Sequence, residues 1–174
     1  SLTNQNIVLE TGTLSVVTAN ELDATTTGTI TATIEPSSVA SLTTLTGTNT
    51  YTITIEGTDA TAATASQLTA ISNATTVAVD ASAVSGLAAD NLSNIETLLI
   101  AGDDTTLFTA DSFSLLEAIA VSDSTLDVSE LNDAIALANT LTGGELAVTA
   151  FSLISGATIN GGDESAFATL ITNG

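Results

Sequence analysis

Carboxylate side chains follow four successive short apolar segments of the sequence. Each segment reads apolar-x-apolar, and the acidic residues that come directly after them are Glu10, Glu35, Glu56 and Asp80. If the segments are strands stacked in register, these carboxylates lie about 4.8 Å apart, and adjacent like charges destabilise a sheet. Ca²⁺, which prefers carboxylate and carbonyl oxygens, would relieve that repulsion. The pattern therefore predicts either a calcium ladder or a solvated acidic face that salt screens within about 8 Å.

Two glycine-acid clusters supply the other candidate metal ligands. They are residues 102–104 (Gly-Asp-Asp) and residues 161–164 (Gly-Gly-Asp-Glu). Neither completes an EF-hand loop or the glycine-rich nonapeptide that binds calcium, and turn formation or helix capping also explains such groups. The candidate ion is Ca²⁺, no cofactor is required, and the candidate ligands are Glu10, Glu35, Glu56, Asp80, Asp103, Asp104 and Asp163.

The composition excludes most catalytic chemistry. The 174 residues include 20 Asp plus Glu and no Lys, Arg, His or Cys, which gives a formal charge of -20. Without cations the chain has no partner for nucleic-acid phosphates, and Ser or Thr nucleophiles have no His or Lys base. Paired carboxylates could still hydrolyse glycosides or peptides, but no D-T-G or D-S-G triplet occurs and aromatic residues make up only 3%. We therefore expect a protein that is not an enzyme and does not bind nucleic acid.

Alternating threonines form a third pattern. Thr27, Thr29, Thr31 and Thr33, and then Thr50, Thr52 and Thr54, occupy every second position and would share one face of a strand. Such hydroxyl arrays suit contact with ice or a glycan. The matching positions of later segments are Ala78, Leu99, Ala120 and Ala147, so we expect a two-strand patch that ordinary β-propensity also explains.

A short apolar-x-apolar-polar motif recurs along the chain. Its second apolar residue falls at positions 9, 34, 55, 79, 100, 121 and 148, so the successive spacings are 25, 21, 24, 21, 21 and 27. Alternation with β-branched residues predicts a short strand at each motif, and segments such as residues 64–71 between motifs have helical spacing. Strands separated by helices pair in parallel through right-handed crossovers.

The expected fold class is therefore α/β. Over residues 1–155 we predict a right-handed, leucine-rich-repeat-like solenoid of about seven parallel strand-helix units, with about 21–27 residues in each unit. Residues 156–174 are expected to form an irregular partial terminal unit of the same domain. The predicted inward side chains are Ile53, Ile55, Val77, Val79, Leu98, Ile100, Ile119 and Val121. The sequence contains no apolar run long enough to span a bilayer as a helix, so we expect no membrane insertion.

The residue three positions after the second apolar residue of each motif also resembles the leucine-rich-repeat pattern, although Ser, Thr or Asp stands at five of the seven positions where that family has Asn. Residues 68–84 and 95–98 are similar to the Thr/Ala-rich, Lys-poor repeat regions of large exported proteins of cyanobacteria and marine bacteria, including S-layer-like and RTX-associated surface proteins. That resemblance implies an extracellular or cell-surface location and an adhesin-like role with calcium in the environment.

Two functions remain open from the sequence. The first is a non-catalytic structural or adhesive repeat segment of a secreted or cell-surface bacterial protein, with neighbouring repeats of the same polypeptide as partners. The alternative is a ligand-binding module whose strand face recognises a glycan, a protein, or an ice or mineral surface.

Overall fold

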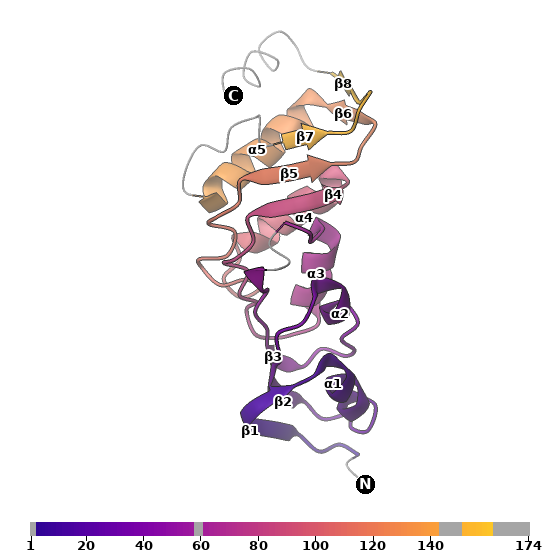
Figure 1. Cartoon of the computed structure of the whole chain (residues 1–174), viewed down its shortest axis with the longest axis vertical. Helices are drawn as coiled ribbons and strands as arrows, with labels where there is room; N and C mark the ends of the chain where they lie inside the picture. Colours follow the sequence, from indigo (N-terminus) through magenta and orange to yellow (C-terminus); the bar gives the residue numbers. More distant parts are fainter. Residues whose placement is uncertain (1–2, 58–60, 143–150, 162–174) are drawn as a thin grey trace.

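The structure is a computed structural model of α/β architecture that describes residues 3–57, 61–142 and 151–161. The described residues form five helices, α1 (Val16–Asp23), α2 (Val39–Leu42), α3 (Ala65–Asn73), α4 (Leu92–Gly102) and α5 (Val128–Thr142). The strands are β1 (Ile7–Leu14), β2 (Ile30–Ile34), β3 (Thr50–Thr52), β4 (Gly86–Asp90), β5 (Ala118–Val121), β6 (Thr125–Asp127), β7 (Phe151–Leu153) and β8 (Thr158–Asn160). Figure 1 shows an elongated molecule with β1 at one end and β8 at the other.

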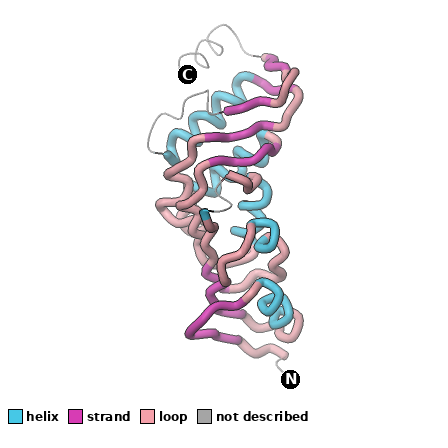
Figure 2. Tube along the Cα trace, in the orientation of Figure 1, coloured by secondary structure: helices cyan, strands magenta, loops and turns pink. Residues whose placement is uncertain are grey.

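The strands form three small sheets, with orders β1-β2-β3, β4-β5-β7 and β6-β8, and every ladder is parallel. Isolated bridges lie outside the named strands, and two of them join Asn49 to Thr75 and Thr54 to Asp80. Figure 2 shows the strands to the left of the helices in the N-terminal half and in front of the long helix α5 in the C-terminal half. The strand side and the helix side therefore present two different surfaces.

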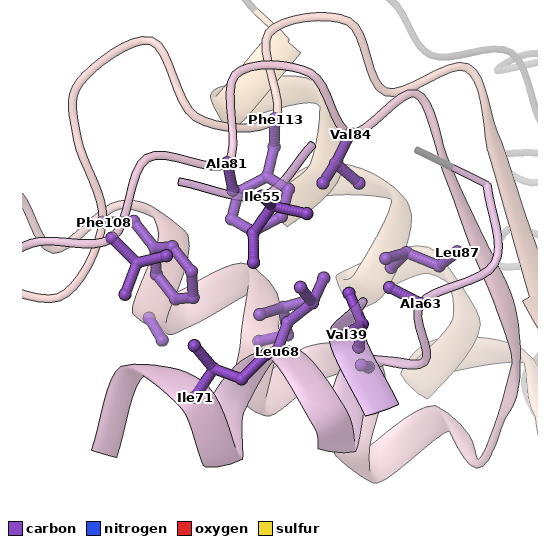
Figure 3. Packing of buried hydrophobic residues seen from close by; sticks show 14 of the residues in the cluster. Val39, Ile55, Ala63, Leu68, Ile71, Ala81, Val84, Leu87, Phe108 and Phe113 are labelled. Atoms are coloured by element: carbon purple, nitrogen blue, oxygen red, sulfur yellow. The ribbon is translucent and has the colours of Figure 1, made fainter. Parts of the chain in front are cut away.

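A single apolar core fills the space between strands and helices. Alternate residues of β2 point inward, so Ile30, Ala32 and Ile34 are at most 4% exposed while Thr33 between them faces outward. Helix α3 directs Leu68 and Ile71 toward the strand side of this core (Figure 3). The burial of apolar residues at period two in strands thus fixes which face of each sheet is free.

Short polar side chains start the helices. Ser15, Ser38, Thr64 and Asn91 each accept a hydrogen bond from a backbone N–H in the first turn of the helix that follows. Thr64 forms a capping box with Gln67. These caps satisfy N–H groups that the helix itself leaves unpaired.

The predicted solenoid of about seven units is wrong. The strands form three separate sheets, and the sequence spacing between paired residues is not constant. Thr31 pairs with Thr50, a spacing of 50 − 31 = 19, whereas Gly86 pairs with Ala118, a spacing of 118 − 86 = 32. A constant unit of about 21–27 residues would give neither of these two spacings. The motif at 146–149 lies outside the described residues.

One predicted strand motif belongs to a helix. Leu98 and Ile100 are expected as inward strand residues, but both lie in α4, where Leu98 is buried and Ile100 is 61% exposed. The apolar residues of α4 recur at Leu92, Ile95 and Leu99, which is helical spacing. A three-residue apolar run fits both the period of a strand and that of a helix. Here the Asn91 cap and the helical spacing of the apolar residues make the segment a helix. Val77 is only half-buried and lies in no strand.

The boundary expected at residue 155 separates β8 from β6, the strand with which it pairs. Strand β8 lies within residues 156–174 and pairs in register with β6, as in Leu126 with Ile159. The rest of that segment, from residue 162 on, is outside the described residues. None of the helices in the described part of the chain is both long and apolar enough to cross a membrane.

Candidate functional site

The outward face of the β1-β2-β3 sheet carries threonines aligned across all three strands. Thr13 of β1 is the register partner of Thr33 of β2, and Thr33 is the register partner of Thr52 of β3. All three side chains are exposed. We call this surface, defined by Thr13, Thr31, Thr33, Thr50, Thr52, Thr54 and Thr76, the threonine face.

A second row of threonines runs beside the first. Thr31 of β2 pairs with Thr50 of β3, and the Thr50 hydroxyl lies 3.1 Å from the hydroxyl of Thr76 on the next segment. On the β1 side, the row ends at Val8, which pairs with Thr31 and is 60% exposed. The patch is therefore wider than the two strands expected from the sequence, because β1 and Thr76 extend it on both sides.

A bulge in β1 places Thr13 on this face. Val8 pairs with Thr31 and Thr13 pairs with Thr33, so β1 advances five positions where β2 advances two. Gly12 within the bulge has φ 85°, a left-handed conformation that glycine adopts without a steric penalty. Without the bulge, Glu10 would stand opposite Thr33. The extra residues therefore replace a carboxylate by a threonine.

Most hydroxyls of the threonine face are free. Thr13, Thr31, Thr33, Thr52 and Thr54 make no side-chain hydrogen bond with any part of the chain that the structure describes. By contrast, Thr43 and Thr44 donate to backbone carbonyls at 2.9 and 2.7 Å. The free hydroxyls can both donate and accept a hydrogen bond, so they are available to a ligand.

The four carboxylates of the predicted ladder do not form one. Glu35 donates its backbone N–H to the Leu14 carbonyl at 2.9 Å, so Glu10 is not its neighbour. Asp80 is the bridge partner of Thr54, two positions before Glu56. Glu10 and Glu35 are exposed. Glu10 thus lies within β1, while Glu35 and Glu56 come after the ends of β2 and β3.

The other candidate ligands are placed at a helix end and a turn. Asp103 is the C-cap of α4, and Asp104 accepts hydrogen bonds from the backbone N–H and the hydroxyl of Thr106 at 2.9 and 2.7 Å. These hydrogen bonds lower the pKa of Asp104. Asp163 lies outside the described residues. Within the described residues, no three acidic side chains come close enough together to hold a metal ion, and calcium binding stays a prediction.

Asp90, which the sequence analysis did not single out, joins β4 to two helices. Its carboxylate accepts hydrogen bonds from the backbone N–H of Ser66, the backbone N–H of Asn91 and the side-chain amide of Asn94, at 2.8, 2.9 and 2.7 Å. Burial by itself would raise the pKa of Asp90, but these hydrogen bonds outweigh it and lower the pKa. This carboxylate has a structural role at the start of α3 and α4.

A small acidic hollow of about 220 Å³ lies between α4 and the β6 region. Its lining includes Glu96, Asp123 and Glu130. Burial and then the negative charges of Glu130 and Asp133 raise the pKa of Glu96. Asp123 is already engaged, because it accepts the backbone N–H of Leu92 at 2.6 Å. Through this hydrogen bond, Asp123 stabilises the start of α4.

Comparison with known proteins gives no relative. No family model, no curated protein sequence and no solved structure matches this chain. Its function has to be inferred from its own geometry, in which the threonine face is a regular, exposed surface of the described residues.

Proposed function

We propose that the chain is a non-catalytic structural or adhesive segment of a secreted or cell-surface bacterial protein. The observation that carries the proposal is the in-register alignment of exposed threonines over β1, β2 and β3. The adhesive surface in this proposal is the threonine face. Its ligand is an extended surface, because a grid repeated in two directions makes many weak contacts at once.

The composition supports a binding role without catalysis. The chain has no Lys, Arg, His or Cys, so it lacks the usual general bases, thiol nucleophiles and phosphate ligands. Three of the carboxylates, those of Asp90, Asp104 and Asp123, are occupied in hydrogen bonds at helix starts and turns. The threonine hydroxyls have no basic neighbour that could activate them as nucleophiles.

The face is also prepared for binding before a ligand arrives. Threonine is β-branched and stiff at χ1, and the strands that carry it are fixed by the buried residues Ile30, Ile34 and Ile53 on their other side. Side chains that are already ordered lose little conformational entropy on binding. A row of such side chains can therefore hold a solid surface although each contact is weak.

Retention on solids tests this function. The purified chain would be passed over crystalline cellulose, chitin, calcium carbonate and ice, together with Thr33→Lys and the control Thr105→Lys. Thr33 is the centre of the first threonine row, while Thr105 is exposed in the turn that follows α4, outside the β1-β2-β3 sheet. We expect retention on at least one solid, loss of retention in Thr33→Lys, and no change in Thr105→Lys. A chain that none of the solids retains, or equal retention of both variants, contradicts the proposal.

A further inference from the structure

We infer that the surface bound by the threonine face is ice, that is, the ordered water lattice at the surface of an ice crystal. This inference rests on the proposed adhesive function and names its ligand. It is carried by the spacing of the threonines, by their free hydroxyls and by the chemistry that the face lacks.

Over β2 and β3 the spacing of the face is regular in two directions. Register partners such as Thr33 and Thr52 lie on neighbouring strands, about 4.8 Å apart, and Thr31 and Thr33 are two positions apart on one strand, about 6.6 Å. Parallel ladders keep this spacing over successive strands. A ligand that uses the whole grid must itself be periodic in two dimensions, which a crystal is and a single polysaccharide chain is not.

Each threonine offers what a water lattice requires. Its hydroxyl donates one hydrogen bond and accepts two, as a lattice water needs, and its methyl group fills space between waters without competing for hydrogen bonds. Thr13, Thr33 and Thr52 form a row in which none of the hydroxyls is used by another described residue. The row can therefore join a hydrogen-bonded network of water at every position.

The face lacks the anchors of a protein or glycan site. Binding energy for proteins concentrates in Trp, Tyr and Arg, and sugars stack on aromatic rings. The chain has no Trp or Arg, and its one tyrosine, Tyr51, is 0% exposed on the opposite side of β3. Phe108 and Phe113 are also 0% exposed and pack edge to face in the core. A grid of hydroxyls without an aromatic platform fits a crystal surface better than either macromolecule.

Charge is kept off the two threonine rows and stands at their edge, where Asp80 is the bridge partner of Thr54. The bulge at Gly12 puts Thr13 where Glu10 would otherwise stand, and Glu35 and Glu56 come only after the ends of β2 and β3. Charged groups orient water around themselves and would disturb a lattice at the face. The net charge of -20 meanwhile keeps copies of the chain apart in solution, so the face stays free for a solid.

The inference is tested by slow freezing from a dilute solution, measuring the partition of the chain between ice and liquid, and by the thermal hysteresis of small ice crystals. We expect enrichment in ice, and a loss of about tenfold or more in partition for Thr33→Lys, the size of one interface anchor. Thr33→Val, which keeps the shape and removes the hydroxyl, should lose less. Thr105→Lys should partition as the original chain does.

The outcomes separate this inference from the proposed function. A chain excluded from ice but retained on cellulose, chitin or calcium carbonate, with that retention lost in Thr33→Lys, overturns ice as the ligand and leaves the adhesive face. A chain that no solid retains overturns both. Circular dichroism melting checks each variant, and if Thr33→Lys does not fold, Thr52→Lys replaces it. Enrichment in ice that Thr33→Lys and Thr52→Lys leave unchanged also overturns the inference.

Discussion

Thr33 and Thr52 are register partners in neighbouring parallel strands, and both side chains are exposed on the same face of the sheet. The residues on either side of Thr33, Ala32 and Ile34, are buried in the core. A slip of one residue would bury the threonines and expose the isoleucines, so burial of one face holds the hydroxyls of the other in place. The order of the threonine face is therefore a consequence of how the core packs.

The Gly12 bulge should be required for this order. A Cβ at Gly12 would meet no atom within 4 Å, so Gly12→Ala acts only through the φ of 85°. We expect it to lower the free energy of unfolding by about 1 kcal/mol and to weaken retention on solids, because Thr13 shifts relative to Thr33. Chemical denaturation and the retention assay measure the two effects. Gly57→Ala is the matched control, since a Cβ there also meets no atom within 4 Å and its φ is not positive. Equal losses in the two variants would contradict the role of the bulge.

Asp90 should stabilise the fold at neutral pH. Asp90→Asn keeps the shape but cannot accept all three hydrogen bonds, so we expect a loss of about 1–3 kcal/mol in the free energy of unfolding at pH 7. Because the folded-state pKa is lowered, the stabilisation is present above the unfolded-state pKa and is lost as pH falls through the folded-state value. Urea titrations at pH 7 and at acidic pH should show the difference between the original chain and Asp90→Asn shrinking in acid. Asp103→Asn, at an exposed C-cap, should change stability little at either pH.

Glu96 should act in the opposite sense. Its pKa is raised in the folded state, first by burial and then by Glu130 and Asp133, so the native state holds the proton more tightly. Its favourable contribution is present below the unfolded-state pKa and disappears as pH rises through the folded-state value. Glu96→Gln should therefore raise the melting temperature at pH 7 and have little effect in acid. Glu21→Gln, an exposed change on α1, serves as the comparison, and an equal gain there would assign the effect to net charge alone.

The Tyr51 hydroxyl should add nothing to stability. It is fully buried without a hydrogen-bond partner of normal geometry among the described residues. Burial and then the negative charge of Asp23 raise its pKa to about 12, although the nearby Asn49 side chain opposes this rise. Removing an unsatisfied polar group from a core is neutral or favourable, so Tyr51→Phe should leave the free energy of unfolding unchanged or raise it by about 1 kcal/mol. A loss larger than that in urea unfolding would show that the hydroxyl is satisfied after all.

The sequence pattern correctly predicted which side chains of several segments face outward and which are buried. Alternation identified the outward threonines of residues 31–33 and 50–54 and the buried positions Ile53, Ile55, Ile119 and Val121, because period two decides which face a side chain takes. The same rule failed at Leu98 and Ile100, since so short a run cannot distinguish a strand from a helix whose cap lies earlier in the chain at Asn91.

Pairing between strands could not be predicted in this way. The Thr11-Gly12-Thr13 sequence contained a signal, because a glycine between polar residues in a strand often marks a bulge. Its effect on register, however, depends on how β2 packs against the core. The separation of Glu10 from Glu35 and the contact of Thr50 with Thr76 have the same origin, so alternation within single segments could not show which carboxylates are neighbours or how far the threonine patch extends.

The most direct test of the account is a threonine-to-lysine scan of retention on the solid that binds best. Single substitutions would cover Thr13, Thr31, Thr33, Thr52 and Thr54 on the threonine face, with Thr43, Thr97 and Thr105 as positions away from it, each checked for folding by circular dichroism. We expect retention to fall only for the first group, and most for Thr33 between its two register partners. Losses spread evenly over both groups, or confined to the second, would contradict it.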